Sequence, residues 1–208
     1  LTEHKSGIGQ YLINILQCWQ NGSDCHEYIL YSNTKIAAEF QDPRFHLRQG
    51  QSRRSSLWCQ FQLPFALRRD RIDVFWGSAY ALPVWRFSIP AVMTVHDFVF
   101  RRYPDMLPFR VTAHLRAGMP FFLRSAEMVI ADSYSTAKDL NEYYESLAGQ
   151  VEVIHLSAHT RFHEKAPTPS VEEVLGKYFL QEGYLLYVGT IEPRKGLDTI
   201  LRAIDYCR

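Results

Sequence analysis

The sequence predicts an α/β protein built on a doubly wound parallel sheet with helices on both faces. Short apolar runs alternate with longer segments of helical periodicity along most of the 208 residues. The runs are continuously apolar, as in AVMTV and YLLYV, and do not alternate between apolar and polar residues. Continuous apolar strands are typical of parallel sheets that are covered on both faces. Such sheets bind ligands at the carboxyl ends of their strands, so the turns after the strands are the candidate sites.

The first part of the chain yields one clear helix and three strands. GIGQYLINILQCWQ carries its apolar residues at helical spacing, and Ser6 is a candidate cap. EYILYS follows as a short strand. Residues 33–56 are polar and poorly periodic, which predicts a loop with some helix, and LWCQFQLPFALRR predicts a helix interrupted by Pro64. IDVFW and AVMTV are rich in β-branched and aromatic residues and predict buried strands.

The second part continues the alternation. Residues 108–125 predict a helix that Gly118 and Pro120 kink. EMVIA is the next strand, and a serine of DSYST caps the following helix, with Thr136 and Asp139 as a candidate capping box. VEVI is a further strand, and the proline-containing HEKAPTPS reads as a linker. A helix at VEEVLGKY, a strand at YLLYV and a helix at GLDTILRAIDYC complete the chain.

The composition excludes several classes of protein. The chain is 47% hydrophobic and 22% charged, with 23 Lys and Arg against 22 Asp and Glu, which argues against a nucleic-acid binder driven by a positive field. The basic clusters RQGQSRR and RRDR are solvated faces in the simplest interpretation, and contact with anionic lipid or an acidic acceptor is the alternative. No apolar run approaches the roughly 20 residues of a membrane helix. Without CxxC or zinc spacing, the cysteines predict free thiols in a reducing compartment: Cys18, Cys25, Cys59 and Cys207.

Two turns in the first half could carry chemistry. In KSGIG, the backbone amides of Gly7, Ile8 and Gly9 open a helix whose dipole favours an anion, although a plain helix start explains the glycines equally well. In TVHDF, His96 ends a strand and can donate to a sugar hydroxyl or to a developing charge. A structural histidine bonded to a neighbouring backbone group is the simpler alternative, and Asp97 caps the next turn in that interpretation.

Two further turns complete the candidates. FWGSAYALP follows a strand, and the aromatic faces of Trp76 and Tyr80 suit sugar rings, although packing is the favoured interpretation. The turn after YLLYV holds Arg194 and Lys195 beside a helix N-terminus. Two cations and a helix dipole would stabilise a departing diphosphate, whereas an exposed basic turn is the plain alternative.

Taken in order, six segments resemble the family-4 retaining glycosyltransferases of the GT-B fold. SGIGQY resembles the glycine-rich entry to the first helix of that family, and DVFWGSAYALP its fourth-strand turn. AVMTVHDFVFRRYPD resembles a characteristic His-Asp segment. VIADSYSTAKDL and VEVIHLSAHTRF resemble the segments that close the N-terminal domain, and YVGTIEPRKGLDTILRAI the start of the donor-binding domain. The resemblance covers most of the chain apart from residues 33–70.

The resemblance implies two Rossmann-like domains that face each other across a cleft. Residues 1–163 would form the N-terminal acceptor-side domain without its first strand, residues 164–170 the linker, and residues 171–208 the beginning of a truncated nucleotide-sugar-binding domain. The implied enzyme moves a mannosyl or glucosyl group, with retention, from a GDP- or UDP-linked donor to a glycan or lipid-linked acceptor in polysaccharide biosynthesis. It implies a cytoplasmic location with peripheral contact at the inner face of the membrane, and no activity for this piece alone.

The resemblance also implies roles for residues of the N-terminal domain. Gly7, Ile8 and Gly9 would approach the diphosphate of the donor from the acceptor side, and His96 would lie near the transferred sugar. The chain departs from the pattern at Ser157, where a glycine is common, so the turn between the domains is expected to differ.

On the donor side, Gly189, Thr190 and Glu192 would line the nucleotide-sugar site. Arg194 and Lys195 would neutralise the leaving diphosphate, so that neither a metal nor another cofactor is required. Many family members have an arginine where this chain has Thr190, and Arg194 is the candidate replacement.

Three other functions are consistent with parts of the sequence. Another GT-B enzyme, such as a sugar-nucleotide epimerase, has a similar fold with different chemistry. A Rossmann dehydrogenase would carry GxGxxG with an acid about twenty residues on, and neither is present. A non-catalytic remnant would bind a partner through an unpaired sheet edge.

Overall fold

The computed structural model describes residues 7–33, 42–50, 55–147, 150–159, 162, 168–181 and 183–207. The chain divides into two compact units, which we call unit 1 (Leu1–His159) and unit 2 (Thr160–Arg208). The predicted domain boundary lies four residues further on. Most of the predicted linker, like the candidate cap Ser6, lies outside the described residues, and residues 168–170 already belong to a helix.

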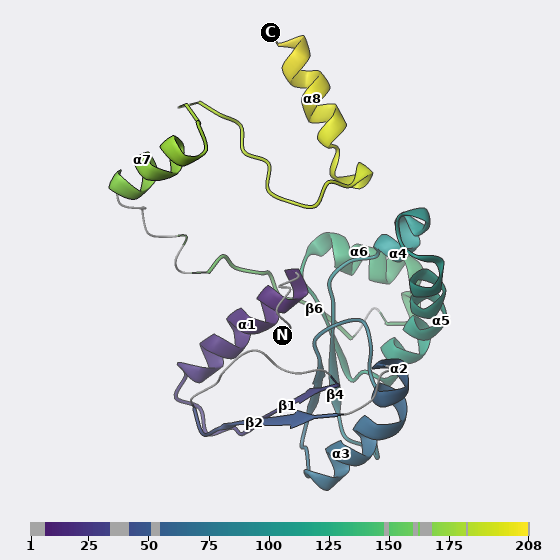
Figure 1. Ribbon diagram of the computed structural model, residues 1–208. Coiled ribbons are helices and arrows are strands. Elements are labelled where there is room, and N and C mark those ends of the chain that lie inside the picture. The colour runs from purple at the N-terminus through teal and green to yellow at the C-terminus, as the bar shows by residue number, and fades with distance from the viewer. Residues whose placement is uncertain are drawn as a thin grey trace. The chain divides into compact units, whose positions relative to one another are not determined.

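Most strands and helices of unit 1 lie where the sequence predicts them (Figure 1). Its elements are α1 (Gly7–Gln20), β1 (Tyr28–Ser32), β2 (Phe45–Gln49), α2 (Ser55–Leu57), η1 (Trp58–Gln62), α3 (Leu63–Arg69), β3 (Phe75–Gly77), β4 (Ala91–Val95), α4 (Val99–Arg102), η2 (Pro104–Met106), α5 (Phe109–Ser125), β5 (Met128–Ala131), α6 (Tyr134–Tyr143), η3 (Glu145–Leu147) and β6 (Val151–Val153).

All strand pairs of unit 1 are parallel, which confirms the predicted fold class. β3, β4, β5 and β6 form a four-stranded sheet in chain order, and β1 pairs with β2 in a second, two-stranded sheet. Figure 1 shows α1 and α5 on opposite sides of the four-stranded sheet. The core lies between this sheet and its helices, and Met93, Val95, Val129 and Leu123 are fully buried in it.

The strand β2 corrects the prediction of loop and helix for residues 33–56. FHLRQ lacks a strand signal because only Phe45 is buried, while Leu47, Arg48 and Gln49 are exposed. Its position is set by non-local contacts instead. Phe45 stacks on Tyr28 of β1 at 4.8 Å between ring centroids, and Arg44 donates to the carbonyl oxygens of Trp19 and Gln20 at the end of α1. Carbonyls at a helix C-terminus attract a cation, so Arg44 ties this strand to α1.

The predicted interruption at Pro64 is a change of helical type and not a break. The five residues Trp58–Gln62 form a π-helical turn that leads directly into α3, and Pro64 occupies the first turn of α3. The proline falls at the junction of the two helical types, where the hydrogen-bond pattern already changes from i−5 to i−4. The next strand, β3, is shorter than the predicted IDVFW and begins at Phe75.

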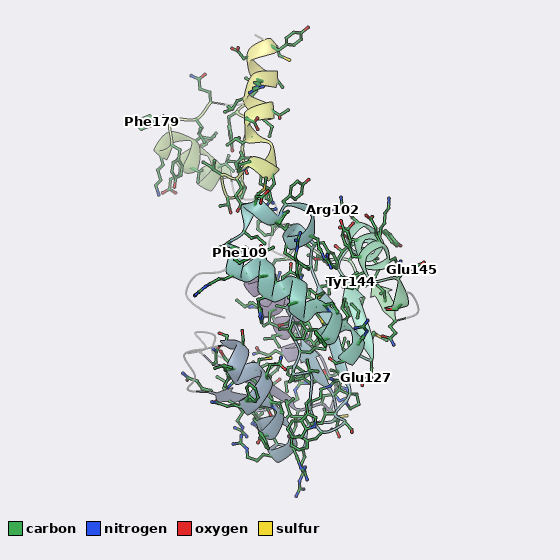
Figure 2. The ribbon with its side chains drawn as sticks, turned by 90° about the vertical axis from the view of Figure 1, so that its right-hand side faces the viewer. Arg102, Phe109, Glu127, Tyr144, Glu145 and Phe179 are labelled. Atoms are coloured by element: carbon green, nitrogen blue, oxygen red, sulfur yellow. The ribbon has the colours of Figure 1, made fainter. Side chains whose placement is uncertain are left out.

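The helix α6 begins where the sequence places a serine cap, but the predicted capping box is wrong. Ser133 caps α6 by accepting a hydrogen bond from the Thr136 amide at 3.1 Å. Asp139 points elsewhere, because its buried carboxylate accepts two hydrogen bonds from the guanidinium of Arg102 on α4. Arg102 and Tyr144, at the end of this helical pair, are labelled in Figure 2. The ion pair joins α4 to α6 across 37 residues of sequence.

Unit 2 contains α7 (Thr168–Lys177), η5 (Pro193–Lys195) and α8 (Leu197–Tyr206). The predicted strand YLLYV is wrong for the structure, because residues 184–188 pair with no strand in the described part of the chain. Leu185, Leu186 and Val188 are accordingly 73–84% exposed. A strand is stable only in a ladder of several strands, so this apolar run has the composition of a buried strand without the neighbours it requires.

The four cysteines are free thiols, as the sequence predicts. Cys18, Cys25 and Cys207 are exposed, whereas burial raises the pKa of Cys59 to about 11. Within the described ranges, no helix is long and apolar enough to cross a membrane.

Asp70 gives unit 1 a testable dependence of stability on pH. Its carboxylate accepts hydrogen bonds from Arg69 at 2.8 Å and from Tyr31 at 2.7 Å, and these bonds, with that of Arg69 the larger cause, lower its pKa to about 2. The unfolded chain protonates this group at about pH 4, so its stabilisation is complete above that pH and is lost as the pH falls towards 2.

We therefore expect the urea midpoint of unit 1 to fall between about pH 4 and pH 2, and Asp70→Asn to flatten that part of the profile. Asp73→Asn, at an exposed carboxylate three residues on, is the control and should leave the slope intact. An Asp70→Asn profile as steep as that of the wild type would contradict the assignment.

Candidate functional site

The carboxyl ends of β3, β4 and β5 bring together polar groups that lie far apart in the sequence. Ser78, His96 and Asp132 are the first residues after these three strands. Neighbouring parallel strands end at the same edge of a sheet, so the three residues are adjacent in space. This is the edge at which doubly wound sheets bind ligands, and we call it the His96 edge.

Both ring nitrogens of His96 are engaged at this edge. Nδ1 lies 3.2 Å from Oδ2 of Asp132, and Nε2 lies 3.0 Å from the carbonyl oxygen of Ser78. The side chains of His96 and Asp132 are only 9% and 13% exposed. A carbonyl and a carboxylate are both acceptors, so the two hydrogen bonds form together only when both ring nitrogens carry a proton.

Two tyrosines pack edge-on against the His96 ring. Tyr11 of α1 lies 5.0 Å from it and Tyr80 lies 6.0 Å from it, measured between ring centroids. Burial, with the nearby Asp97 carboxylate adding to it, raises the pKa of Tyr80 well above its usual value, and burial raises that of Tyr11. Both phenols therefore stay protonated at neutral pH. The His96 ring thus lies between two aromatic rings, with its two nitrogens directed at Asp132 and Ser78.

Asp132 is the residue of this edge that the sequence reasoning missed. It follows β5 as His96 follows β4, and that shared position is the signal that could have identified it. Thr136 on the first turn of α6 lies within hydrogen-bond distance of both the His96 carbonyl oxygen, at 3.0 Å, and Oδ1 of Asp132, at 3.2 Å. The cap of α6 and the His96–Asp132 pair are therefore one connected network.

The glycine-rich start of α1 belongs to the same edge. Gly7 is the first residue of α1, and a Cβ built on it would meet nothing within 4 Å, so this position is open to solvent among the described residues. Ile8 and Gly9 follow in the same first turn. Tyr11, one turn into the helix, contacts the His96 ring. The structure thus brings the predicted anion-binding turn and the predicted histidine to one place in unit 1.

The aromatic turn after β3 serves packing, as the sequence analysis favours. Trp76 donates its indole N–H to Thr94 of β4 at 2.9 Å. Its ring packs against Tyr11 at 6.1 Å and Trp19 at 5.3 Å between centroids. These contacts fix α1 on the sheet and so fix the position of its first turn.

The second group of predicted residues lies in unit 2. Pro193–Lys195 form a short 3₁₀ turn, and Gly196, in the left-handed conformation at φ 67°, is the N-cap of α8. In the described part of the chain, no side-chain hydrogen bond caps this helix. Arg194 and Lys195 therefore stand directly before a helix N-terminus whose first amides are not occupied by a capping side chain, an arrangement that favours an anion.

The two cations of this turn differ in their environment. Arg194 Nε lies 2.6 Å from the Glu192 carboxylate, so its charge is neutralised within the turn. Lys195 has no ion-pair partner in the part of the chain that the structure describes. Gly189 and Thr190 precede the turn, and the hydroxyl of Tyr187 donates to the Thr190 carbonyl oxygen at 2.9 Å. Of the predicted cations, Lys195 is the one available to a ligand.

The described residues contain no group of three or more His, Cys, Asp or Glu side chains that could hold a metal ion. The chemistry that the described groups can supply is hydrogen bonding and positive charge. The His96 edge offers an imidazole ring and helix amides, and the basic turn before α8 offers Lys195 and further amides.

Comparison with known proteins places this arrangement in a family. The sequence profile of Glycosyltransferase Family 4 matches residues 5–161. O-antigen chain mannosyltransferase B of Escherichia coli is 27% identical over 140 residues, which are 67% of this chain and 36% of that protein. The chain thus spans about a third of the length of this curated relative.

A solved structure shows the same fold. The crystal structure of Alr3699/HepE from Anabaena, in complex with UDP and glucose, matches with a TM-score of 0.64 at 15% identity. The match covers 100% of this chain and 56% of that one. Because the family profile covers three quarters of the chain and the GT-B fold agrees, the chain belongs to glycosyltransferase family 4.

Proposed function

We propose that this chain supplies the acceptor-side domain and the first donor-side elements of a retaining transferase. That enzyme moves a mannosyl or glucosyl group from a GDP- or UDP-linked donor to a glycan or lipid-linked acceptor. The observation that carries the proposal is the basic turn before α8: among the described residues Lys195 has no ion-pair partner, and the helix N-terminus beside it has no side-chain cap. Charge that develops on a leaving diphosphate is stabilised by such preorganised donors. The names of the two similar proteins, a mannosyltransferase and a protein solved with UDP and glucose, support this substrate class.

At the His96 edge we propose that Gly7, Ile8 and Gly9 approach the diphosphate and that His96 lies beside the transferred sugar. Nε2 of His96 lies 3.0 Å from the Ser78 carbonyl oxygen on the side away from Asp132, and in this proposal it exchanges that contact for a sugar hydroxyl. Asp132 keeps the ring oriented from the other side. In this proposal Lys195, with Arg194 beside it, neutralises the leaving group, and no metal or other cofactor takes part. Gly189, Thr190 and Glu192 belong to the donor side.

We further propose that these residues act as part of a longer enzyme and that they do not transfer sugar by themselves. The proposal is supported by the lengths of the similar proteins, of which this chain covers 36% and 56%. It is also supported by the exposed apolar run at residues 184–188, which has the composition of a strand without its sheet. We also propose that the enzyme lies in the cytoplasm and contacts the inner face of the membrane, because a lipid-linked acceptor would be presented there.

The proposed function is tested by titration calorimetry on the product of the whole gene. We expect binding of GDP- or UDP-sugars with micromolar to millimolar affinity, which is usual for enzyme substrates. Binding of a nicotinamide dinucleotide instead would favour a dehydrogenase, and no binding of any nucleotide would favour a remnant without catalytic function. Gly7→Val is the matched variant, because its side chain would enter the open first turn of α1 and weaken donor binding.

A further inference from the structure

A second surface of unit 1 lies far from the His96 edge and has a different chemistry. We call it the Trp85 patch, and its members are Phe61, Phe65, Arg68, Arg71, Val84, Trp85 and Phe87. They come from the helical segment that ends in α3 and from the loop that leads into β4. α3 lies at the lower end of unit 1 in Figure 1.

The helix α3 carries apolar side chains on both faces. Leu63 and Leu67 are buried against the core, as expected for a surface helix. Phe61 and Phe65, one turn apart, are 66% and 58% exposed on the outer side. Burial explains the first pair but not the second, because an exposed apolar face adds nothing to the stability of the monomer.

The loop before β4 extends this apolar face. Trp85 is 55% exposed and packs edge-on against Phe65 at 5.7 Å, and its ring lies 4.0 Å from that of Phe87, measured between centroids. Phe87 and Ser88 both have positive φ, at 54° and 63°, a conformation that is costly for residues other than glycine.

A buried arginine holds this strained loop in place. Arg86, 7% exposed, donates to the carbonyl oxygens of Ile89 and Ser125 and to the carboxylate of Glu127 at 2.8 Å. Glu127 is labelled in Figure 2, well below Arg102 in that view. The hydrogen bonds of Arg86 therefore fix the loop on the protein side. Trp85 and Phe87, on either side of Arg86, pack against Phe65, and Trp85 is exposed to solvent.

Beside the rings lies a hollow of about 480 Å³ with a positive lining. Arg68 and Arg71 line it together with Phe87 and Ser88, and the Arg68 guanidinium lies 4.6 Å from the centroid of the Phe87 ring. Asp70 is the nearest carboxylate in sequence, but its oxygens are taken by Tyr31, Arg69 and Arg48. Neither Arg68 nor Arg71 has an ion-pair partner among the described residues.

We propose that the Trp85 patch docks unit 1 on the surface of an anionic lipid bilayer. Tryptophan and phenylalanine settle at the boundary between head groups and acyl chains, and arginine guanidinium groups bind lipid phosphates. The charge of the bilayer complements the two unpaired arginines, and its interior accepts Phe61, Phe65 and Trp85. The patch lies at the amino ends of β3 and β4, where the Phe75 amide meets the Pro90 carbonyl oxygen, so docking leaves the His96 edge at the opposite ends free.

Co-sedimentation of the chain with lipid vesicles tests this proposal without any assay of sugar transfer. We expect binding to vesicles of phosphatidylcholine and phosphatidylglycerol in about equal parts, no binding to phosphatidylcholine alone, and weaker binding as salt rises from about 0.05 to 0.3 M. Arg68→Gln with Arg71→Gln should weaken binding about 25-fold, since one arginine near an anionic surface contributes about fivefold. Phe65→Ser with Trp85→Ser should weaken it by more than about tenfold.

A matched pair of residues on α5 provides the control. Phe121, 59% exposed, and Arg124 have the same spacing and exposure as Phe65 and Arg68, so Phe121→Ser with Arg124→Gln should bind vesicles as the wild type does. Circular dichroism establishes that each variant is folded. Equal loss in the control and the patch variants, or no binding to anionic vesicles, overturns the proposal. Self-association that the patch variants abolish, without vesicle binding, would assign the patch to a second copy of the chain and equally overturn it.

Discussion

Replacing Lys195 by alanine should lower the rate of sugar transfer by the whole-gene enzyme by more than about tenfold, the usual minimum for loss of one donor to a developing charge. The residue is exposed and has no ion-pair partner among the described residues, so its removal breaks no structural contact there. Its position directly before the uncapped N-terminus of α8 is the physical reason for the expected loss. The measurement is steady-state release of nucleoside diphosphate.

The Lys195 prediction has two controls within the same unit. Lys195→Arg keeps a cation before α8 and should retain much of the rate, whereas Lys177→Ala removes an exposed lysine at the end of α7 and should have no effect. Loss in kcat, with an unchanged melting curve, is the expected pattern, because the charge acts as the bond breaks. An unchanged rate in Lys195→Ala would remove this residue from the mechanism.

Phe98→Ala should lower the free energy of unfolding of unit 1 by about 3–5 kcal/mol, the usual cost of deleting a buried phenylalanine ring. Phe98 is 1% exposed and packs against Phe100 at 5.5 Å, Tyr143 at 5.7 Å and Tyr144 at 6.1 Å between ring centroids. These rings join the segment after β4 to the end of α6, so the cavity would also loosen the His96 edge two residues away.

Urea unfolding followed by circular dichroism measures this cost. Phe109→Ala is the matched control, because Phe109 at the start of α5 is 85% exposed and projects from unit 1 in Figure 2. Its removal should change the free energy of unfolding by less than about 0.5 kcal/mol. A Phe98→Ala cost as small as that of the control would contradict the packing described above.

The parts of the fold that local sequence can specify were predictable. AVMTV and EMVIA are apolar and rich in β-branched residues because β4 and β5 are central strands with both faces covered. FHLRQ has no such signal, because β2 lies in a two-stranded sheet and depends on distant parts of the chain: Tyr28 stacks on Phe45, and the end of α1 accepts hydrogen bonds from the adjacent Arg44. The prediction for YLLYV is wrong for the opposite reason: its composition is that of a strand, but no strand among the described residues pairs with it.

The same distinction between local sequence and non-local contacts applies to the candidate site. His96 and the glycines at the start of α1 could be chosen as candidates from the sequence because each stands next to an element of clear type. Asp132 has the same position after its strand, but its contact with His96 depends on β4 and β5 being neighbours, which the local sequence does not specify. The pairing of Glu192 with Arg194 depends likewise on the geometry of the turn, which reduces the availability of one of the two predicted cations.

The central claim is that protein cations and helix amides, led by Lys195, stabilise a diphosphate leaving group during retaining sugar transfer. Its most direct test is NMR of the reaction of the whole-gene enzyme with a GDP- or UDP-sugar and a glycan acceptor, in the presence of a metal chelator. We predict a product with the anomeric configuration of the donor, formed at the same rate with and without the chelator and slowed by Lys195→Ala. A product with the inverted anomeric configuration would contradict this claim. So would a wild-type reaction that stops when the chelator is added, together with a Lys195→Ala enzyme that works at the wild-type rate without the chelator.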